Sequence, residues 1–158
     1  ILSYKGRDWR DVETLAALNT PASIQAMKDC LHNSNLDARL CAVRLLKEME
    51  IEDRIEKVVV ETLPLTTIGA GLSYALNLAQ TYPSEAIRRK VLWCALNGSK
   101  DIRIHCAAMS LYLYGVTSVT FDNRYPVIYE FREPLRVMRL KPFRQLCALV
   151  GVDPASLE

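Results

Sequence analysis

The sequence predicts an all-α protein, an α-solenoid of about four helix pairs with an N-terminal capping helix, in a single domain of residues 1–158. The first observation is a repeat, because the stretch 99–115, SKDIRIHCAAMSLYLYG, has a counterpart at 35–49 and a weaker one at 133–149. The second is a spacing of 32, 33 and 33 residues between helix starts, which is typical of helical repeat arrays. These starts are expected near Leu36, Ile68, Asp101 and Pro134.

The first two helices follow from apolar spacing and from capping residues. Residues 1–9 show little periodicity and are expected to be an extended lead-in. From Trp9 to Leu18, apolar residues recur at helical spacing, which predicts a helix that caps the array. Thr20 before Pro21 combines an N-cap with a first-turn proline, so a second helix is expected to run from there to His32.

The middle of the chain is predicted to hold three further helices. Leu36–Met49 has a continuous apolar stripe, and Glu52–Leu63 has a second stripe opposite a row of charged residues. Ile68–Thr81 is expected to be a helix that contains Gly69 and Gly71. Two glycines inside a helix cost about 1 kcal/mol each relative to alanine, so they indicate close approach to a neighbouring helix.

The C-terminal half is predicted from a cap, the second copy of the repeat and two prolines. Ser84 is a candidate N-cap for a helix whose buried stripe ends at Ala95. The stretch 99–115 gives the next helix. Tyr125–Phe131 is expected to be a short helix, and Pro142 is expected to kink or divide the last one. The resulting helix pairs lie at about 20–49, 52–81, 84–115 and 121–151.

An Asp-x-Arg pattern before a helix rich in small residues resembles the HEAT repeat. The pattern occurs at Asp37 and Arg39 and again at Asp101 and Arg103, and the resemblance covers roughly residues 20–150. It implies that these four side chains tie neighbouring units together through hydrogen bonds. The copy that begins at Ile68 lacks both residues, and the copy that begins at Pro134 lacks the aspartate, which puts the individual repeat boundaries in doubt.

Composition restricts the class of protein. The net charge is only +2, from 20 basic and 18 acidic residues, so no overall field attracts nucleic acid or a membrane. Five cysteines without a CxxC pair suit a reducing compartment, and we expect a cytoplasmic protein. No cysteine or histidine has ligand-like spacing, and no apolar run is long enough to span a bilayer, so neither a metal, a cofactor nor a membrane partner is expected.

The sequence favours a protein-binding module over an enzyme. Polar rows on two helices form the predicted partner-binding surface, and Trp93, an aromatic residue among hydrogen-bond donors, has the composition of an interface hot spot. The alternative is that Trp93 packs on an adjacent repeat or loop. The predicted partner-binding residues are Arg54, Lys57, Glu61, Arg89, Trp93 and Asn97.

A second resemblance makes the expected function more specific. The segments FDNRYPVIYEF and LCALVGVDP resemble C-terminal portions of small bacterial HEAT-like immunity proteins that are encoded beside polymorphic toxins. This resemblance implies a cytoplasmic protein that binds a toxin domain and neutralises it.

Two alternatives remain for the function. One is a scaffold or adaptor protein. The other is a HEAT-like nucleic-acid-binding protein or DNA glycosylase, in which Arg88, Arg89, Lys90 and Lys100 contact phosphates. The balanced charge argues against the second alternative. The oligomeric state and the identity of the partner are left open.

Overall fold

The chain is all-helical in a computed structural model that describes residues 8–157. The part of the expected lead-in before Asp8 lies outside the described residues. No β-strand occurs among the described residues, and only isolated bridges join Thr67 to Ala70 and Gly71. The elements are α1 (Trp9–Leu18), α2 (Pro21–Cys30), α3 (Leu36–Glu48), α4 (Ile55–Thr62), η1 (Leu63–Leu65), α5 (Leu72–Thr81), α6 (Glu85–Asn97), α7 (Lys100–Leu113), η2 (Pro126–Arg132), α8 (Arg136–Val150) and η3 (Pro154–Ser156). The prediction of an all-α protein is confirmed.

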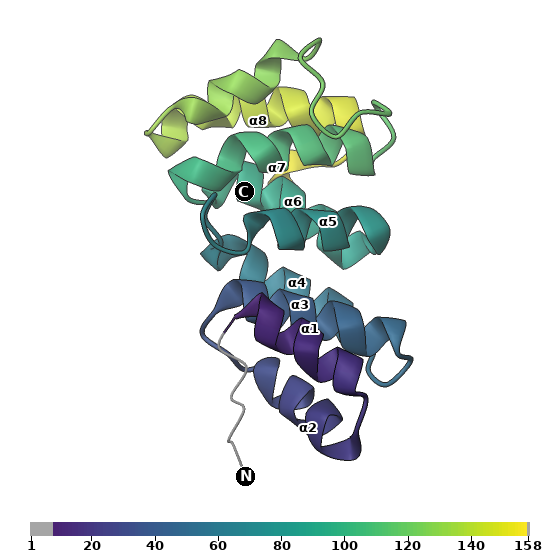
Figure 1. Cartoon of the computed structure of the whole chain (residues 1–158). Helices are drawn as coiled ribbons and strands as arrows, with labels where there is room; N and C mark the ends of the chain where they lie inside the picture. Colours follow the sequence, from purple (N-terminus) through teal and green to yellow (C-terminus); the bar gives the residue numbers. More distant parts are fainter. Residues whose placement is uncertain (1–7, 158) are drawn as a thin grey trace.

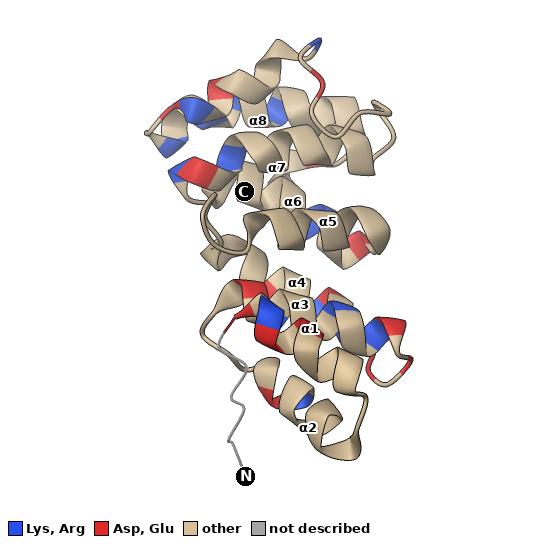
Figure 2. Ribbon diagram, viewed as in Figure 1, with Lys and Arg blue, Asp and Glu red and all other residues tan. Residues whose placement is uncertain are grey.

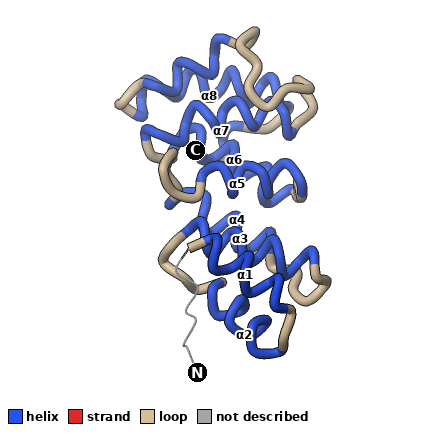
Figure 3. The backbone as a smooth tube through the Cα atoms, viewed as in Figure 1, coloured by secondary structure: helices blue, strands red, loops and turns tan. Residues whose placement is uncertain are grey.

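The helices stack into an elongated body of two layers (Figures 1 and 3). We call α1, α3, α5, α7 and η2 the odd layer, because each of these elements packs on the next one. We call α4, α6 and α8 the even layer, in which α4 packs on α6 and α6 on α8. At the N-terminal end, α2 packs on α1 and α3. From α3 to α7, successive α-helices therefore alternate between the two layers, whereas η2 stays in the same layer as α7.

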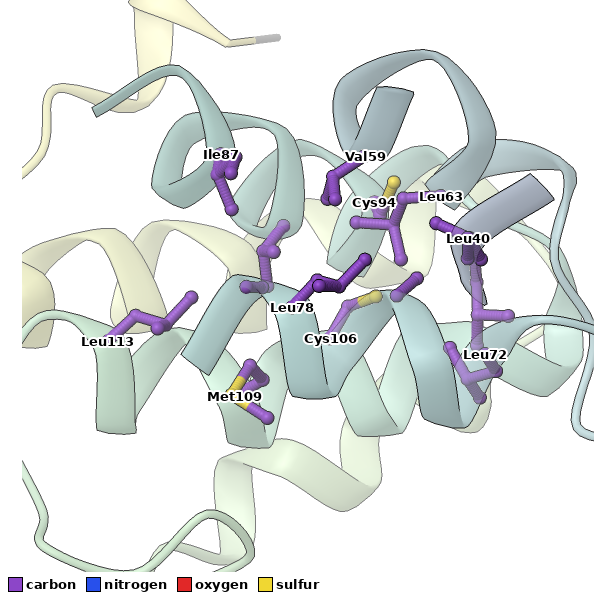
Figure 4. Packing of buried hydrophobic residues seen from close by; sticks show 14 of the residues in the cluster. Leu40, Val59, Leu63, Leu72, Leu78, Ile87, Cys94, Cys106, Met109 and Leu113 are labelled. Carbon is purple, nitrogen blue, oxygen red and sulfur yellow. The ribbon is translucent and has the colours of Figure 1, made fainter. Parts of the chain in front are cut away.

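One continuous apolar core runs between the layers, from Val12 in α1 to Cys147 in α8. Figure 4 shows its middle, where Cys106 of α7 lies near Leu78 of α5 and Cys94 of α6. The largest fully buried side chains include Phe131 of η2 and Phe143 of α8. The core therefore extends to the C-terminal end of the stack.

Local capping explains several helix starts. The Thr20 hydroxyl accepts a hydrogen bond from the Ser23 backbone N–H at 3.1 Å, and the Ser84 hydroxyl accepts one from Ile87 at 3.3 Å. Both predicted caps are confirmed. The capping box of α1 was not predicted: the Asp8 carboxylate accepts from backbone N–H groups of the first turn, and Asp11 reciprocates.

The largest departure from the predicted helices is at α5, which begins at Leu72 and not at Ile68. Gly69 and Gly71 therefore precede the helix instead of lying within it. Gly71 has φ +80°, a left-handed conformation that favours glycine, and a Cβ there would lie 2.8 Å from the Leu36 Cβ. The close approach expected of these glycines does occur at Gly71, but it occurs in a turn.

Smaller corrections concern α2, α4 and α8. Helix α2 ends at Cys30, before His32, and α4 begins only at Ile55. Helix α8 continues as one α-helix through Pro142, so the division expected there does not occur. Pro142 has no N–H to donate to the Met138 carbonyl, so the helix continues without that one backbone hydrogen bond.

No helix in the described part of the chain combines the length and the apolar character needed to cross a membrane. The longest of them, α8, has 15 residues and contains four basic side chains.

Candidate interaction surface

The predicted contact residues of α4 are largely paired within the chain. The Arg54 guanidinium lies 2.6 Å from the Glu52 carboxylate, and this hydrogen bond lowers the pKa of Glu52. Glu61 accepts from Arg39 of α3 at 2.8 Å and lies 4.0 Å from Lys57. The charges in this row mostly have partners already, so a binding partner would have to replace existing ion pairs there.

The predicted residues of α6 form a row along the outer face of the even layer, because Arg89, Trp93 and Asn97 are spaced four residues apart. Trp93 is partly buried and packs against the core, so part of its ring is covered and part stays accessible. The ammonium of Lys90 lies 4.5 Å from the centroid of the ring. This cation–π contact places a cation over the indole ring.

Segments from the end of the chain fix both ends of this row. Arg89 donates to the Ser156 carbonyl at 3.2 Å and to its hydroxyl at 3.0 Å, where the C-terminal segment returns to α6 (Figure 1). The Asn97 side chain accepts from Arg136 of α8 at 3.0 Å and donates to the Trp93 carbonyl at 3.4 Å. We call Arg89, Lys90, Trp93 and Asn97 the α6 row. Its polar side chains are held in place by contacts within the chain.

The four residues expected to tie the units together fall into different environments. Asp37 accepts a hydrogen bond from the Gly71 backbone N–H at 2.9 Å, which links the start of α3 to the start of α5. Arg39 reaches Glu61 on α4. Asp101 is exposed in the first turn of α7, with no hydrogen bond or ion pair to any described residue.

Arg103, the fourth of them, is buried and binds backbone carbonyls. Its guanidinium donates to Phe131 at 2.9 Å and to Glu133 at 3.2 Å, with longer contacts to Gly98 and Arg132. Burial lowers the pKa of Arg103. These bonds attach the start of α7 to η2 and to the turn that follows it.

Sequence reasoning missed Arg139, which has a similar role in α8. This buried arginine donates to the carbonyls of Leu96, Glu133 and Pro134 at 3.1, 2.6 and 2.7 Å. Burial lowers the pKa of Arg139, and the nearby positive charge of Arg103 adds to this effect. An arginine within an apolar stripe was the available signal, but the sequence does not show which carbonyls it reaches.

Charge is segregated along the stack, although the total is small (Figure 2). Residues 8–66 carry 7 basic and 11 acidic side chains, a net charge of −4. Residues 67–157 carry 11 basic and 6 acidic side chains, a net charge of +5. The small net charge of the whole chain therefore does not describe the electrostatic field around each half. The net charge of residues 67–157 is positive enough to attract an anionic partner.

The odd layer has its own groove, between α3 and α5. It has a volume of about 400 Å³, and Arg44, Tyr74 and Asn77 are among the residues that line it. Arg44 lies 2.9 Å from Glu48 and 3.8 Å from Glu13, so its charge is already compensated. Burial raises the pKa of Tyr74. This groove offers polar contacts but lacks an uncompensated charge to orient a ligand.

Within residues 8–157, no group of three histidine, cysteine or carboxylate side chains is arranged to hold a metal ion. His32 is exposed in the turn after α2, and His105 lies against Phe121 with ring centroids 5.7 Å apart. Asp122 binds Thr117 and Arg124, at 2.7 Å in both cases. His105 and Asp122 therefore have structural partners.

Comparison with family models, with curated proteins and with solved structures finds no match to this chain.

Proposed function

We propose that this chain is a protein-binding module built as a HEAT-like α-solenoid of about four helix pairs. Its more specific role would be that of a cytoplasmic immunity protein that binds and neutralises a bacterial toxin domain. The alternation of helices between two layers supports the array, as does the Asp37–Gly71 hydrogen bond between residues 34 apart. Five buried cysteines without a disulfide support a reducing compartment.

The α6 row is the observation that carries the binding proposal. Trp93 supplies a large, stiff apolar surface, and Lys90, Arg89 and Asn97 surround it with donors. Because Ser156 and Arg136 already hold two of these side chains, binding would cost little additional side-chain entropy. A preorganised aromatic residue with a polar rim is the usual centre of a protein interface.

The test is a pull-down from the native host with three proteins: wild type, Trp93→Ala and Tyr112→Ala. Tyr112 is the matched control, because it is a partly buried aromatic residue of the odd layer. We expect one protein to co-purify with wild type and with the control, and to bind Trp93→Ala more weakly by about 2 kcal/mol. Equal affinity of a correctly folded Trp93→Ala variant would remove the α6 row from the interface.

The toxin assignment needs a separate measurement. The gene of the recovered partner would be expressed with and without this chain, and growth would be followed. We expect the partner to be toxic alone and harmless with the chain present. A partner that is not toxic would leave the protein-binding proposal standing and refute the immunity role.

A nucleic-acid partner is the second candidate, and the net charge of +5 on residues 67–157 favours it. The phosphate contacts would come from Arg88, Arg89, Lys90 and Lys100. Four such contacts predict that affinity falls about 100-fold between 50 and 200 mM salt, whereas an interface centred on an aromatic residue keeps most of its affinity. A titration of labelled duplex DNA over this salt range separates the two candidates.

A further inference from the structure

Large apolar side chains are exposed on α8 and at its N-cap, at the C-terminal end of the stack. Leu135 is 62% exposed, Val137 66%, Met138 57% and Leu149 45%. The opposite side of α8 packs on α6, α7 and η2 and buries Phe143. Exposed large aliphatic side chains on one element make it a candidate contact surface.

The same face is basic. Residues 134–152 contain four basic side chains and no aspartate or glutamate. Arg139 is buried and Arg136 donates to Asn97. Lys141 and Arg144 are exposed and lie beside Val137 and Leu140. A ligand of this face therefore meets positive charge beside aliphatic surface.

A shallow hollow follows the helix along this face. It has a volume of about 590 Å³ and is lined by Val137, Leu140, Lys141, Arg144, Gln145 and Ala148. These residues recur at steps of three and four, so they form one stripe over three turns. The small side chain of Ala148 widens one end of the stripe. An extended hollow with this period is suited to a second helix laid along α8.

We propose that the outer face of α8 binds an acidic, amphipathic helix of a partner protein. The aliphatic side chains would pack against leucine-type residues of that helix, and Lys141 and Arg144 would pair with its glutamate or aspartate side chains. This surface differs from the α6 row, so the inference goes beyond the proposed function and does not depend on Trp93.

The basic and aliphatic side chains of this face favour an acidic helix over two other occupants, a second copy of the chain and nucleic acid. A symmetric contact of α8 with α8 of a second copy would place basic side chains against basic ones, which is unfavourable. Nucleic acid would satisfy the cations but would leave the aliphatic side chains of the same stripe, Val137 and Leu140, without a matching surface. An acidic amphipathic helix satisfies both the charges and the apolar surface.

The test uses the full chain and a fluorescent synthetic helix with leucines at steps of three and four and glutamates on both flanks. The second probe has lysines in place of the glutamates. We expect the glutamate peptide to bind and the lysine peptide to bind at least about tenfold more weakly. Lys141→Glu should reverse this preference, and Val137→Asp should abolish binding of the glutamate peptide.

Matched controls test the location. Lys100→Glu reverses an exposed charge on α7, and Leu65→Asp alters a side chain that is 64% exposed on η1. Both variants, and Trp93→Ala, should bind the glutamate peptide as wild type does. Circular dichroism establishes that each variant is folded.

Four results would overturn the proposal. The first is no measurable binding of the glutamate peptide by folded wild-type protein. The second is equal binding of both peptides, which would show that charge does not select the ligand. The third is binding to phosphatidylglycerol vesicles that Val137→Asp abolishes while the peptide does not bind. The fourth is self-association in sedimentation equilibrium that the same variant removes.

Discussion

Replacement of Asp37 by alanine tests whether the hydrogen bond between the start of α3 and the start of α5 stabilises the stack. The Asp37 carboxylate accepts from the Gly71 N–H at 2.9 Å, and Gly71 is buried with φ +80°. The variant leaves this N–H without its acceptor, at the start of α5. Asp101 provides the control, because it has the same place in its motif and in its helix but no such partner among the described residues.

The two substitutions should differ clearly in their effect on stability. A hydrogen bond to a charged acceptor contributes about 1.5–3 kcal/mol, and an acidic residue in the first turn of a helix contributes about 0.3–1 kcal/mol. Asp37→Ala loses both contributions, so we expect a loss of about 2–4 kcal/mol. Asp101→Ala loses only the second, so we expect less than about 1 kcal/mol.

Urea unfolding, followed by circular dichroism at 222 nm, measures both values. Tryptophan fluorescence on the same samples shows whether the two ends of the stack unfold together, since Trp9 lies in α1 and Trp93 in α6. Equal midpoints for Asp37→Ala and Asp101→Ala would refute the reasoning, because the bond to Gly71 would then contribute nothing.

Three further substitutions test other contacts. Arg103→Met removes the buried guanidinium from its carbonyl acceptors and should cost about 3 kcal/mol in urea unfolding; a loss below about 1 kcal/mol would contradict this role. Ser84→Ala removes the N-cap of α6 and should cost about 1 kcal/mol in the same assay. Hydrogen bonds from Arg124 and Thr117 hold the pKa of Asp122 far below its usual range. The charged form therefore stabilises the fold above the unfolded pKa of about 3.9, and this contribution is lost as pH falls. Asp122→Asn should weaken the pH dependence of unfolding below about pH 5, and an unchanged dependence would contradict the assignment.

Local signals predicted most of the helices. Apolar spacing located α1 and α3, and the caps Thr20 and Ser84 located α2 and α6, because each of these signals acts within one helical turn. The start of α5 was wrong for a physical reason. Gly71 takes a left-handed conformation where its N–H bonds to Asp37, a residue 34 positions earlier. No local pattern indicates that contact.

The candidate site was harder to predict than the fold. The charged row on α4 resembled a free surface in the sequence, but Arg39 on α3 already pairs with Glu61. The position of Arg89 depends on Ser156, which is 67 residues away. The segregation of charge, in contrast, is readable from the sequence once the two halves are counted separately. A single total conceals it.

The burial of all five cysteines gives the stack a built-in set of reporters. They lie in α2, α3, α6, α7 and α8, and none is more than 3% exposed. An alkylating reagent reaches each thiol only when its own segment opens, so the modification rate of each cysteine, read by mass spectrometry, gives the opening free energy of its helix. Cys30 and Cys147 report on fraying of the two ends, and Cys94 and Cys106 report on the middle. A profile of opening along the whole molecule is therefore measurable without introducing any label.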